Sequence, residues 1–174
     1  MFELFPRICV LDVDLFHQAS SQMDYCTPLI VYPNILQVRE QLFHYIVDDL
    51  SPDSIVDFAW NLNYLVAGSY YHKFVIFIDA HRCRQDAIIG ELIGKYWRES
   101  IPFYPGDFFN HNANYRSSRK KGIGVIKYDD VKAREGLYSF AQQITKFDYY
   151  LQSVIPQNEP AFGIGGLTKA YTLN

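Results

Sequence analysis

Three aspartates stand in or directly after apolar segments, where gathered carboxylates can hold a cation. Asp12 and Asp14 lie in the stretch RICVLDVDLFHQA, and Asp79 closes the stretch KFVIFID. A carboxylate beside a buried strand must be hydrogen-bonded, solvated or bound to a cation. Facing carboxylates repel one another unless a hard cation such as Mg²⁺ (or Mn²⁺) lies among them. The pattern predicts metal-assisted phosphodiester hydrolysis; the alternative is that Asp12 caps a turn and Asp79 is a solvated strand end.

Two arginines follow Asp79 closely, in the stretch AHRCRQD. Arg82 or Arg84 could neutralise the phosphate that is cut, or could instead pair with Asp79 or Asp86. The five histidines form neither an H-E-x-x-H nor an H-x-H motif. The predicted catalytic residues are therefore aspartates and arginines, and no histidine is assigned to the site.

A basic segment in the second half of the chain offers contacts for phosphate groups. The stretch NYRSSRKKGIGVIKYDDVKAR carries seven of the sixteen Lys and Arg residues, and several aromatic residues precede it. Charge mixed with stacking surface suits single-stranded or branched nucleic acid, and the alternative is a solvated loop. The residues expected to bind nucleic acid are Tyr115, Arg116, Arg119, Lys120, Lys121 and Lys127.

The composition is that of one globular domain. The chain has 174 residues, of which 49% are hydrophobic and 17% aromatic, which excludes a disordered chain. The net charge of −3 excludes a uniformly basic nucleic-acid coat, so any nucleic-acid site must be a local patch. Three scattered cysteines, the lack of a signal-peptide pattern and the lack of a long apolar run predict a cytoplasmic protein without a transmembrane helix.

Hydrophobic periodicity predicts the elements that would position these residues. Strands are expected over 8–13 and 74–78, helices over 34–50, 51–68, 84–97 and 130–151, and loops over 20–34 and 101–124. Apolar strands separated by helices predict an α/β fold with a parallel sheet, in which ligands bind beyond the carboxyl ends of the strands. Asp12, Asp14 and Asp79 would then share one edge of the sheet.

With these motifs the chain resembles the phage-type 5′-nucleases, the flap endonuclease-like proteins of the PIN-like superfamily. ICVLDVDLFHQA resembles the first strand of that family, which ends in a metal-binding aspartate, here Asp12. KFVIFIDAHRCRQD resembles its second motif, which would make Asp79 a ligand and Arg82 or Arg84 a substrate contact. NYRSSRKKG resembles the Tyr-Lys-x-x-Arg segment that leads into the helical arch.

The resemblance implies a PIN-like three-layer core with a parallel sheet and flanking helices. It also implies Mg²⁺- or Mn²⁺-dependent cleavage of branched or single-stranded DNA. The later Glu-Ala-Asp-Asp motif of the family is matched only by Glu159, in NEPAFGIGG, and the family's Asp-x-Asp strand and helix-hairpin-helix have no counterpart. The expected acidic site is therefore incomplete, with Asp12, Asp14, Asp79 and Glu159 as its metal ligands.

We expect one α/β domain over residues 1–158, followed by an irregular tail over residues 159–174 that could dock a protein partner. The first functional hypothesis is a nuclease-like, nucleic-acid-binding protein, completed in its site by another chain. The second is a catalytically inactive binding protein of a larger, phage-type complex. The third is a phosphatase, because VLDVDLF is similar to the Asp-x-Asp motif of haloacid dehalogenase-like enzymes.

Overall fold

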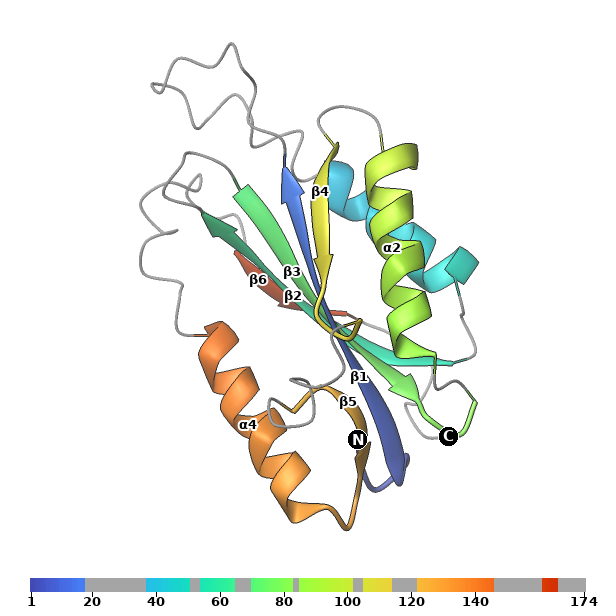
Figure 1. Cartoon of the computed structure of the whole chain (residues 1–174), viewed down its shortest axis with the longest axis vertical. Helices are drawn as coiled ribbons and strands as arrows, with labels where there is room; N and C mark the ends of the chain where they lie inside the picture. The colour runs from blue at the N-terminus through green and yellow to red at the C-terminus, as the bar shows by residue number, and fades with distance from the viewer. Residues whose placement is uncertain are drawn as a thin grey trace, which may run out of the picture.

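A six-stranded antiparallel sheet forms the centre of the molecule in the computed structural model (Figure 1). The structure describes residues 1–17, 37–50, 54–64, 70–82, 85–101, 105–113, 122–145 and 161–165. The strands are β1 (Arg7–His17), β2 (Ile55–Tyr64), β3 (Tyr70–Asp79), β4 (Pro105–Asn110), β5 (Gly124–Lys127) and β6 (Phe162–Ile164). Their order is β4-β1-β3-β2-β6, and β5 also pairs with β1.

The first strand is the longest and holds the sheet together. One edge of β1 pairs with β3 along most of its length, from Ile8 opposite Asp79 to Phe16 opposite Tyr71. Its other edge pairs with β5 near Arg7 and with β4 near Leu15, so β4 and β5 follow one another along that edge. Strand β1 therefore has β3 along one edge, and first β5 and then β4 along the other.

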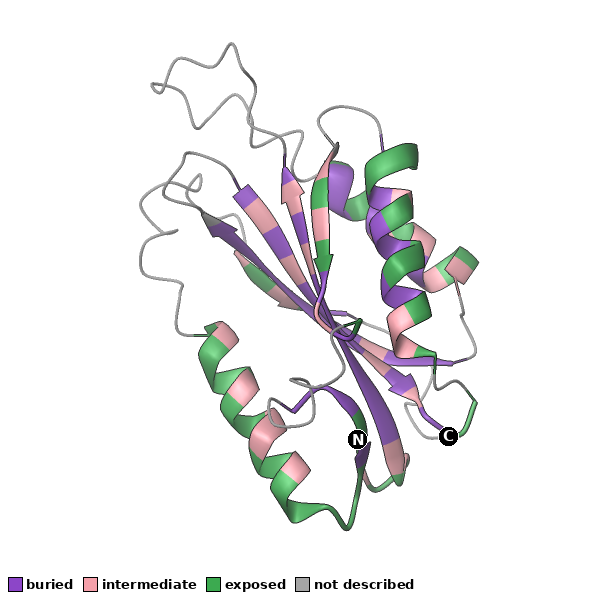
Figure 2. Cartoon of the chain, viewed as in Figure 1, coloured by how far each residue is buried: buried purple, intermediate pink, exposed green. Residues whose placement is uncertain are grey.

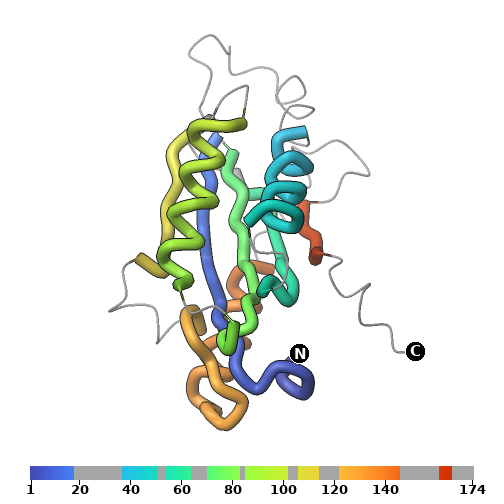
Figure 3. Tube along the Cα trace, turned by 90° about the vertical axis from the view of Figure 1, so that its right-hand side faces the viewer, coloured from blue at the N-terminus to red at the C-terminus, as the bar shows by residue number. Residues whose placement is uncertain are grey.

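The larger part of the hydrophobic core lies on one face of this sheet. Helix α2 (Asp86–Ser100) and the helical residues 37–50, which end in the π-helical segment η1 (Tyr45–Leu50), cover this face together (Figure 3). Alternate residues of β1, such as Leu11 and Leu15, point into this core because side chains alternate along a strand. Helix α2 lies close to β4 at Gly94, where a Cβ atom would collide with the Phe108 ring.

The opposite face is covered over only part of its length. Helix α4 (Val131–Thr145) lies near the N-terminal end of β1, where Leu137 and Phe140 pack against Ile8 and Val10 (Figures 1 and 2). No residue of α4 is fully buried. Beyond α4, the same sheet face carries polar side chains, several of them buried, and exposed aromatic side chains. The candidate site lies there.

The structure confirms several predicted elements. Strands lie over 8–13 and 74–78, and helix α2 covers most of the predicted helix over 84–97 but extends to Ser100. Residues 37–50 and α4 are helical within the predicted helices over 34–50 and 130–151. None of the described helices is both long and apolar enough to cross a membrane. The predicted loop over 20–34 lies outside the described residues.

The predicted parallel sheet of a PIN-like three-layer core is wrong, because every strand pairing is antiparallel. The predicted helix over 51–68 is also wrong, because residues 55–64 of this segment form strand β2. This strand is buried on both faces, so its apolar residues Phe58, Ala59 and Leu62 also fit helical spacing. Two further segments that were predicted to lack regular structure contain strands, namely β4 within 101–124 and β6 within the tail.

Candidate metal centre

Two strands and the turn after a third bring four charged or ionisable side chains together on the open sheet face. Asp12 and Asp14 are two residues apart in β1 and therefore point to the same face. Lys73 of β3 stands directly opposite Asp14. His111 follows β4 immediately, and its backbone N–H donates a hydrogen bond to the carbonyl of Asp12 (3.1 Å).

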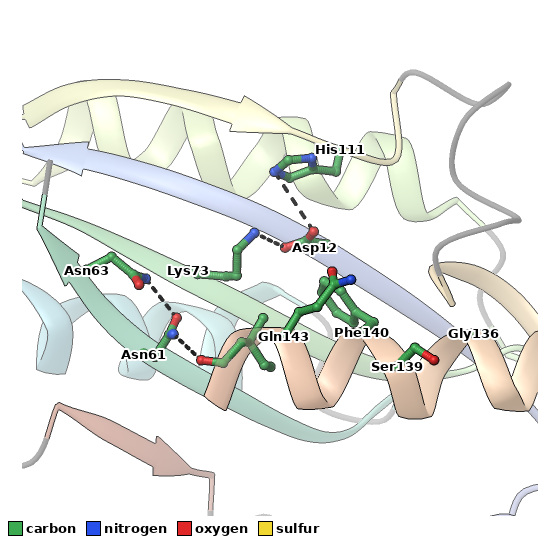
Figure 4. A pocket seen from close by; sticks show the side chains of 10 residues that line it. Asp12, Asn61, Asn63, Lys73, His111, Gly136, Ser139, Phe140 and Gln143 are labelled. Carbon is green, nitrogen blue, oxygen red and sulfur yellow. Dashed lines mark hydrogen bonds and ion pairs between the residues drawn. The ribbon is translucent and has the colours of Figure 1, made fainter. Parts of the chain in front are cut away.

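The lysine and the histidine approach the Asp12 carboxylate from different sides (Figure 4). Lys73 Nζ lies 2.9 Å from Asp12 Oδ1 and 2.7 Å from Asp14 Oδ1. His111 Nε2 lies 2.8 Å from Asp14 Oδ2 and 3.9 Å from Asp12 Oδ2. The two Oδ1 atoms are thus neutralised by Lys73, and the two Oδ2 atoms face the imidazole.

Burial and charge act differently on the two aspartates. Burial raises the pKa of Asp12, and the opposing charges of Lys73 and His111 reverse this only in part. Burial also raises the pKa of Asp14, but the hydrogen bond from His111 and the charge of Lys73 outweigh it, so that this pKa falls below its usual value. Burial alone would lower the pKa of Lys73, but the two carboxylates raise it overall. At neutral pH, Lys73 is an ammonium and Asp14 a carboxylate.

A buried asparagine holds the end of β4 against β1. The side chain of Asn112 accepts a hydrogen bond from the Asp12 N–H (3.0 Å) and donates to the Val10 carbonyl (2.9 Å). It also donates to Asp86 Oδ2 at the start of α2 (2.6 Å), while its own N–H donates to Asn110 Oδ1 (3.1 Å). His111 lies between these two asparagines, so their hydrogen bonds fix its position.

The donor set fits a divalent cation. Asp12, Asp14 and His111 each offer one ligand atom, and the three atoms lie within 4.8 Å of one another. Ligands bound at about 2.1 Å from one ion lie roughly 3 Å apart, so a small closure of the group would suffice. Imidazole combined with carboxylates favours Mn²⁺ or Zn²⁺, whereas Mg²⁺ prefers oxygen ligands alone.

The structure does not bring Asp79 to this group. Asp79 stands opposite Ile8, four residues along β1 from Asp12, which corresponds to about 13 Å. Its Oδ1 accepts a hydrogen bond from the His81 N–H (2.9 Å), and its Oδ2 lies 3.7 Å from Arg82 Nε. Because β1 and β3 are antiparallel, the C-terminal end of β3 lies beside the N-terminal end of β1, which separates Asp79 from Asp12.

The other predicted site residues lie away from the group or outside the described residues. Lys127 is exposed on β5 opposite Arg7, at the far end of β1. The predicted residues outside the described ranges are Arg84, Tyr115, Arg116, Arg119, Lys120, Lys121 and Glu159. The sequence did not predict Lys73 and His111 as site residues. For His111 there was one local signal, the polar stretch NHNAN that follows Phe108 and Phe109.

Aromatic rings flank the charged group on the same sheet face. Phe109 of β4 stands opposite Asp14, is 44% exposed, and contacts the His111 ring edge-on at 4.7 Å between ring centroids. Phe162 of β6 stands opposite Asn61 and is 37% exposed. One exposed phenylalanine thus lies on either side of the polar centre.

Comparisons with protein-family models, with curated proteins and with solved structures find no match to this chain. The expected resemblance to 5′-nucleases therefore gains no support from them, and a functional interpretation depends on the geometry of the site.

Proposed function

We propose that this protein is a metal-dependent nuclease that binds single-stranded or branched DNA across the open face of its sheet. The observation that carries the proposal is the grouping of Asp12, Asp14 and His111 beside Lys73. A divalent cation and a nearby ammonium group are suited to cleaving phosphodiesters, because both stabilise negative charge on the phosphate oxygens.

Each part of the site has a role in this proposal. A divalent ion bound by the three ligands would supply an activated water and would stabilise charge on the phosphate. Lys73 keeps the two carboxylates together and adds positive charge beside them. Phe109 and Phe162 offer faces on which bases can stack. The basic residues of the segment 116–121, which follows His111 in the chain, remain expected phosphate contacts.

The first test is cleavage of labelled single-stranded and 5′-flap DNA with Mn²⁺, Zn²⁺ or Mg²⁺. Asp14→Asn and His111→Ala should each reduce cleavage by about 100-fold or more, because each removes a metal ligand. Asp79→Asn is the matched control and should cleave as the wild type does, since it alters a carboxylate on the same sheet face away from the group. Equal loss in Asp79→Asn, or wild-type activity in Asp14→Asn, would contradict the proposal.

A binding protein without catalysis is the second candidate, and one observation favours it. Lys73 already neutralises one oxygen of each carboxylate, so the group is stable without an ion. Binding of DNA in EDTA, unchanged by added metal and followed by no cleavage, would support this alternative. The same variants tested on a phosphate monoester address the phosphatase hypothesis, for which cleavage of the monoester alone is the expected result.

A further inference from the structure

Beside the metal centre, a pocket opens between α4 and the sheet. Its volume is about 360 Å³, which lies within the range of small-molecule sites. The sheet side is formed by Asp12, Asn61, Asn63 and Lys73, with His111 beside them, and the helix side by Gly136, Ser139, Phe140, Gln143 and Ile144 (Figure 4). The pocket is therefore lined by charged groups at one end and by amides with apolar surface at the other.

The hydrogen bonds of the amide end leave one acceptor aimed at no protein partner. Asn61 donates from Nδ2 to the Ile144 carbonyl (2.8 Å), and its Oδ1 accepts from Asn63 Nδ2 (3.0 Å). Asn63 is only 6% exposed, yet within the described residues its Oδ1 accepts no hydrogen bond. As an amide oxygen that lines the pocket, it can accept a hydrogen bond from solvent or from a ligand held there.

Two further polar groups face the pocket from α4. The side chains of Ser139 and Gln143 make no hydrogen bond with the described residues, and both line the pocket. Phe140 adds a ring whose centroid lies 6.0 Å from Lys73 Nζ. The Gln143 amide can both donate and accept hydrogen bonds, and Asn63 Oδ1 is a second acceptor. These groups match the hydrogen-bonding edge of a nucleobase, and the Phe140 ring matches its face.

We propose that this pocket holds one base of the bound DNA strand, and that its amides make cleavage base-selective. The inference rests on the proposed function. Asp12, Lys73 and His111 belong both to the pocket and to the charged group, so a base held by Asn63 and Gln143 places its own phosphate beside the metal centre.

The test measures base preference without cleavage. Fluorescently labelled single strands of dA, dC and dT and an abasic strand of equal length are titrated in EDTA. The wild type should prefer one base by at least about fivefold, the lower limit for a bidentate amide contact. Gln143→Met should reduce this preference to less than about twofold, while its affinity for the abasic strand stays unchanged because backbone contacts remain.

Gln142→Met is the matched control, because Gln142 is the adjacent amide of α4 and does not line the pocket. It should keep the preference of the wild type. Ser139→Ala is a second pocket variant and should also weaken the preference. Tight binding of all strands without base preference would overturn the pocket assignment alone. Failure to bind any strand would overturn the proposed function as well.

Discussion

Lys73 is the residue that allows two aspartates to share one face of a buried strand. Its ammonium lies within 2.9 Å of both carboxylates and leaves their Oδ2 atoms facing His111. A cation bound at the Oδ2 atoms would perform the same neutralisation through the other oxygens. The lysine and the metal are therefore partly interchangeable in stabilising the folded protein.

We predict that Lys73→Met makes stability dependent on metal. Without metal, loss of this largely buried ion pair should lower the free energy of unfolding by about 3 kcal/mol, because two facing carboxylates remain. Added Mn²⁺ should restore a large part of this loss, and should stabilise the variant more than it stabilises the wild type.

Urea unfolding with and without Mn²⁺ measures both quantities. Lys95→Met, which alters an exposed lysine on α2, is the control and should change neither. A Lys73→Met variant that is as stable as the wild type, or that gains nothing from Mn²⁺, would contradict the interchange of lysine and metal.

A buried histidine pair on the other sheet face predicts a loss of stability in mild acid. His17 Nε2 lies 3.0 Å from His72 Nδ1. Burial holds the pKa of His17 at about 4 and, together with the charges of His17 and Arg39, holds the pKa of His72 well below its usual value of 6.5. The unfolded chain takes up these protons below about pH 6.5, whereas the folded protein does not.

The contribution of His17 is therefore fully present above pH 6.5 and is lost as the pH falls toward 4, at about 1.4 kcal/mol per pH unit. The contribution of His72 is likewise fully present above pH 6.5 and is lost as the pH falls below it. His72→Gln should reduce the slope of stability against pH between pH 6 and pH 5 by about this amount, as measured by urea unfolding. Substitution of the exposed His44 by Gln should leave the slope unchanged. If the stability of His72→Gln changed with pH as steeply as that of the wild type, His72 would not be a source of the pH dependence.

At the same scale, the sequence predicted the aspartates of the site but not their partners. Asp12 and Asp14 interrupt an apolar strand, which is a local signal. His111 reaches Asp14 from 97 positions away, and Lys73 reaches Asp12 from 61 positions away. Such partners are set by strand pairing, which a single sequence does not determine.

At the scale of elements, the helices were easier to predict than the strands. Helices α2 and α4 are amphipathic, with one apolar face each, and this pattern is local. Strand β2 is buried on both faces, and β4 is short and contains Pro105 and Gly106, so neither shows clear alternation. The antiparallel direction depends on contacts such as Ile8 with Asp79, which lie far apart in the chain.

The turn after β4 is the element that assembles the metal centre, and Asn112→Ala tests this. The variant loses the bonds to Val10 and Asp86 and leaves the buried Asp12 N–H without its acceptor. We expect the free energy of unfolding to fall by about 2–3 kcal/mol. Metal affinity should fall about tenfold or more, although Asn112 is not a ligand, because His111 is no longer held in position.

Calorimetric titration with Mn²⁺ and urea unfolding separate positioning from ligation. His111→Ala should lose metal affinity with a smaller loss of stability, because His111 is partly exposed while Asn112 is buried. Unchanged Mn²⁺ affinity in Asn112→Ala would show that the turn keeps its geometry without these hydrogen bonds.

At the scale of the molecule, the two faces of the sheet differ in how firmly they are covered. Most of the large, fully buried side chains belong to the core beneath α2 and residues 37–50. The cluster under α4 is smaller, and α4 itself has no buried residue. Local stability follows buried apolar contact, so α4 should open more readily than the strands beneath it. Because α4 forms one wall of the proposed base pocket, its opening would also remove that wall.

Hydrogen exchange tests this difference between the two faces. Amides of α4 should exchange through local opening, at a lower free energy than amides of β1 and β3. Leu137→Ala should lower the opening free energy of α4 by about 1–2 kcal/mol while the exchange of β1 and β3 changes less, because Leu137 contacts only the smaller cluster and is itself half-buried. Tyr138→Ala, at the adjacent exposed position, should change neither. If α4 and β1 instead exchanged with one common free energy in the wild type, the helix would be part of a single cooperative unit.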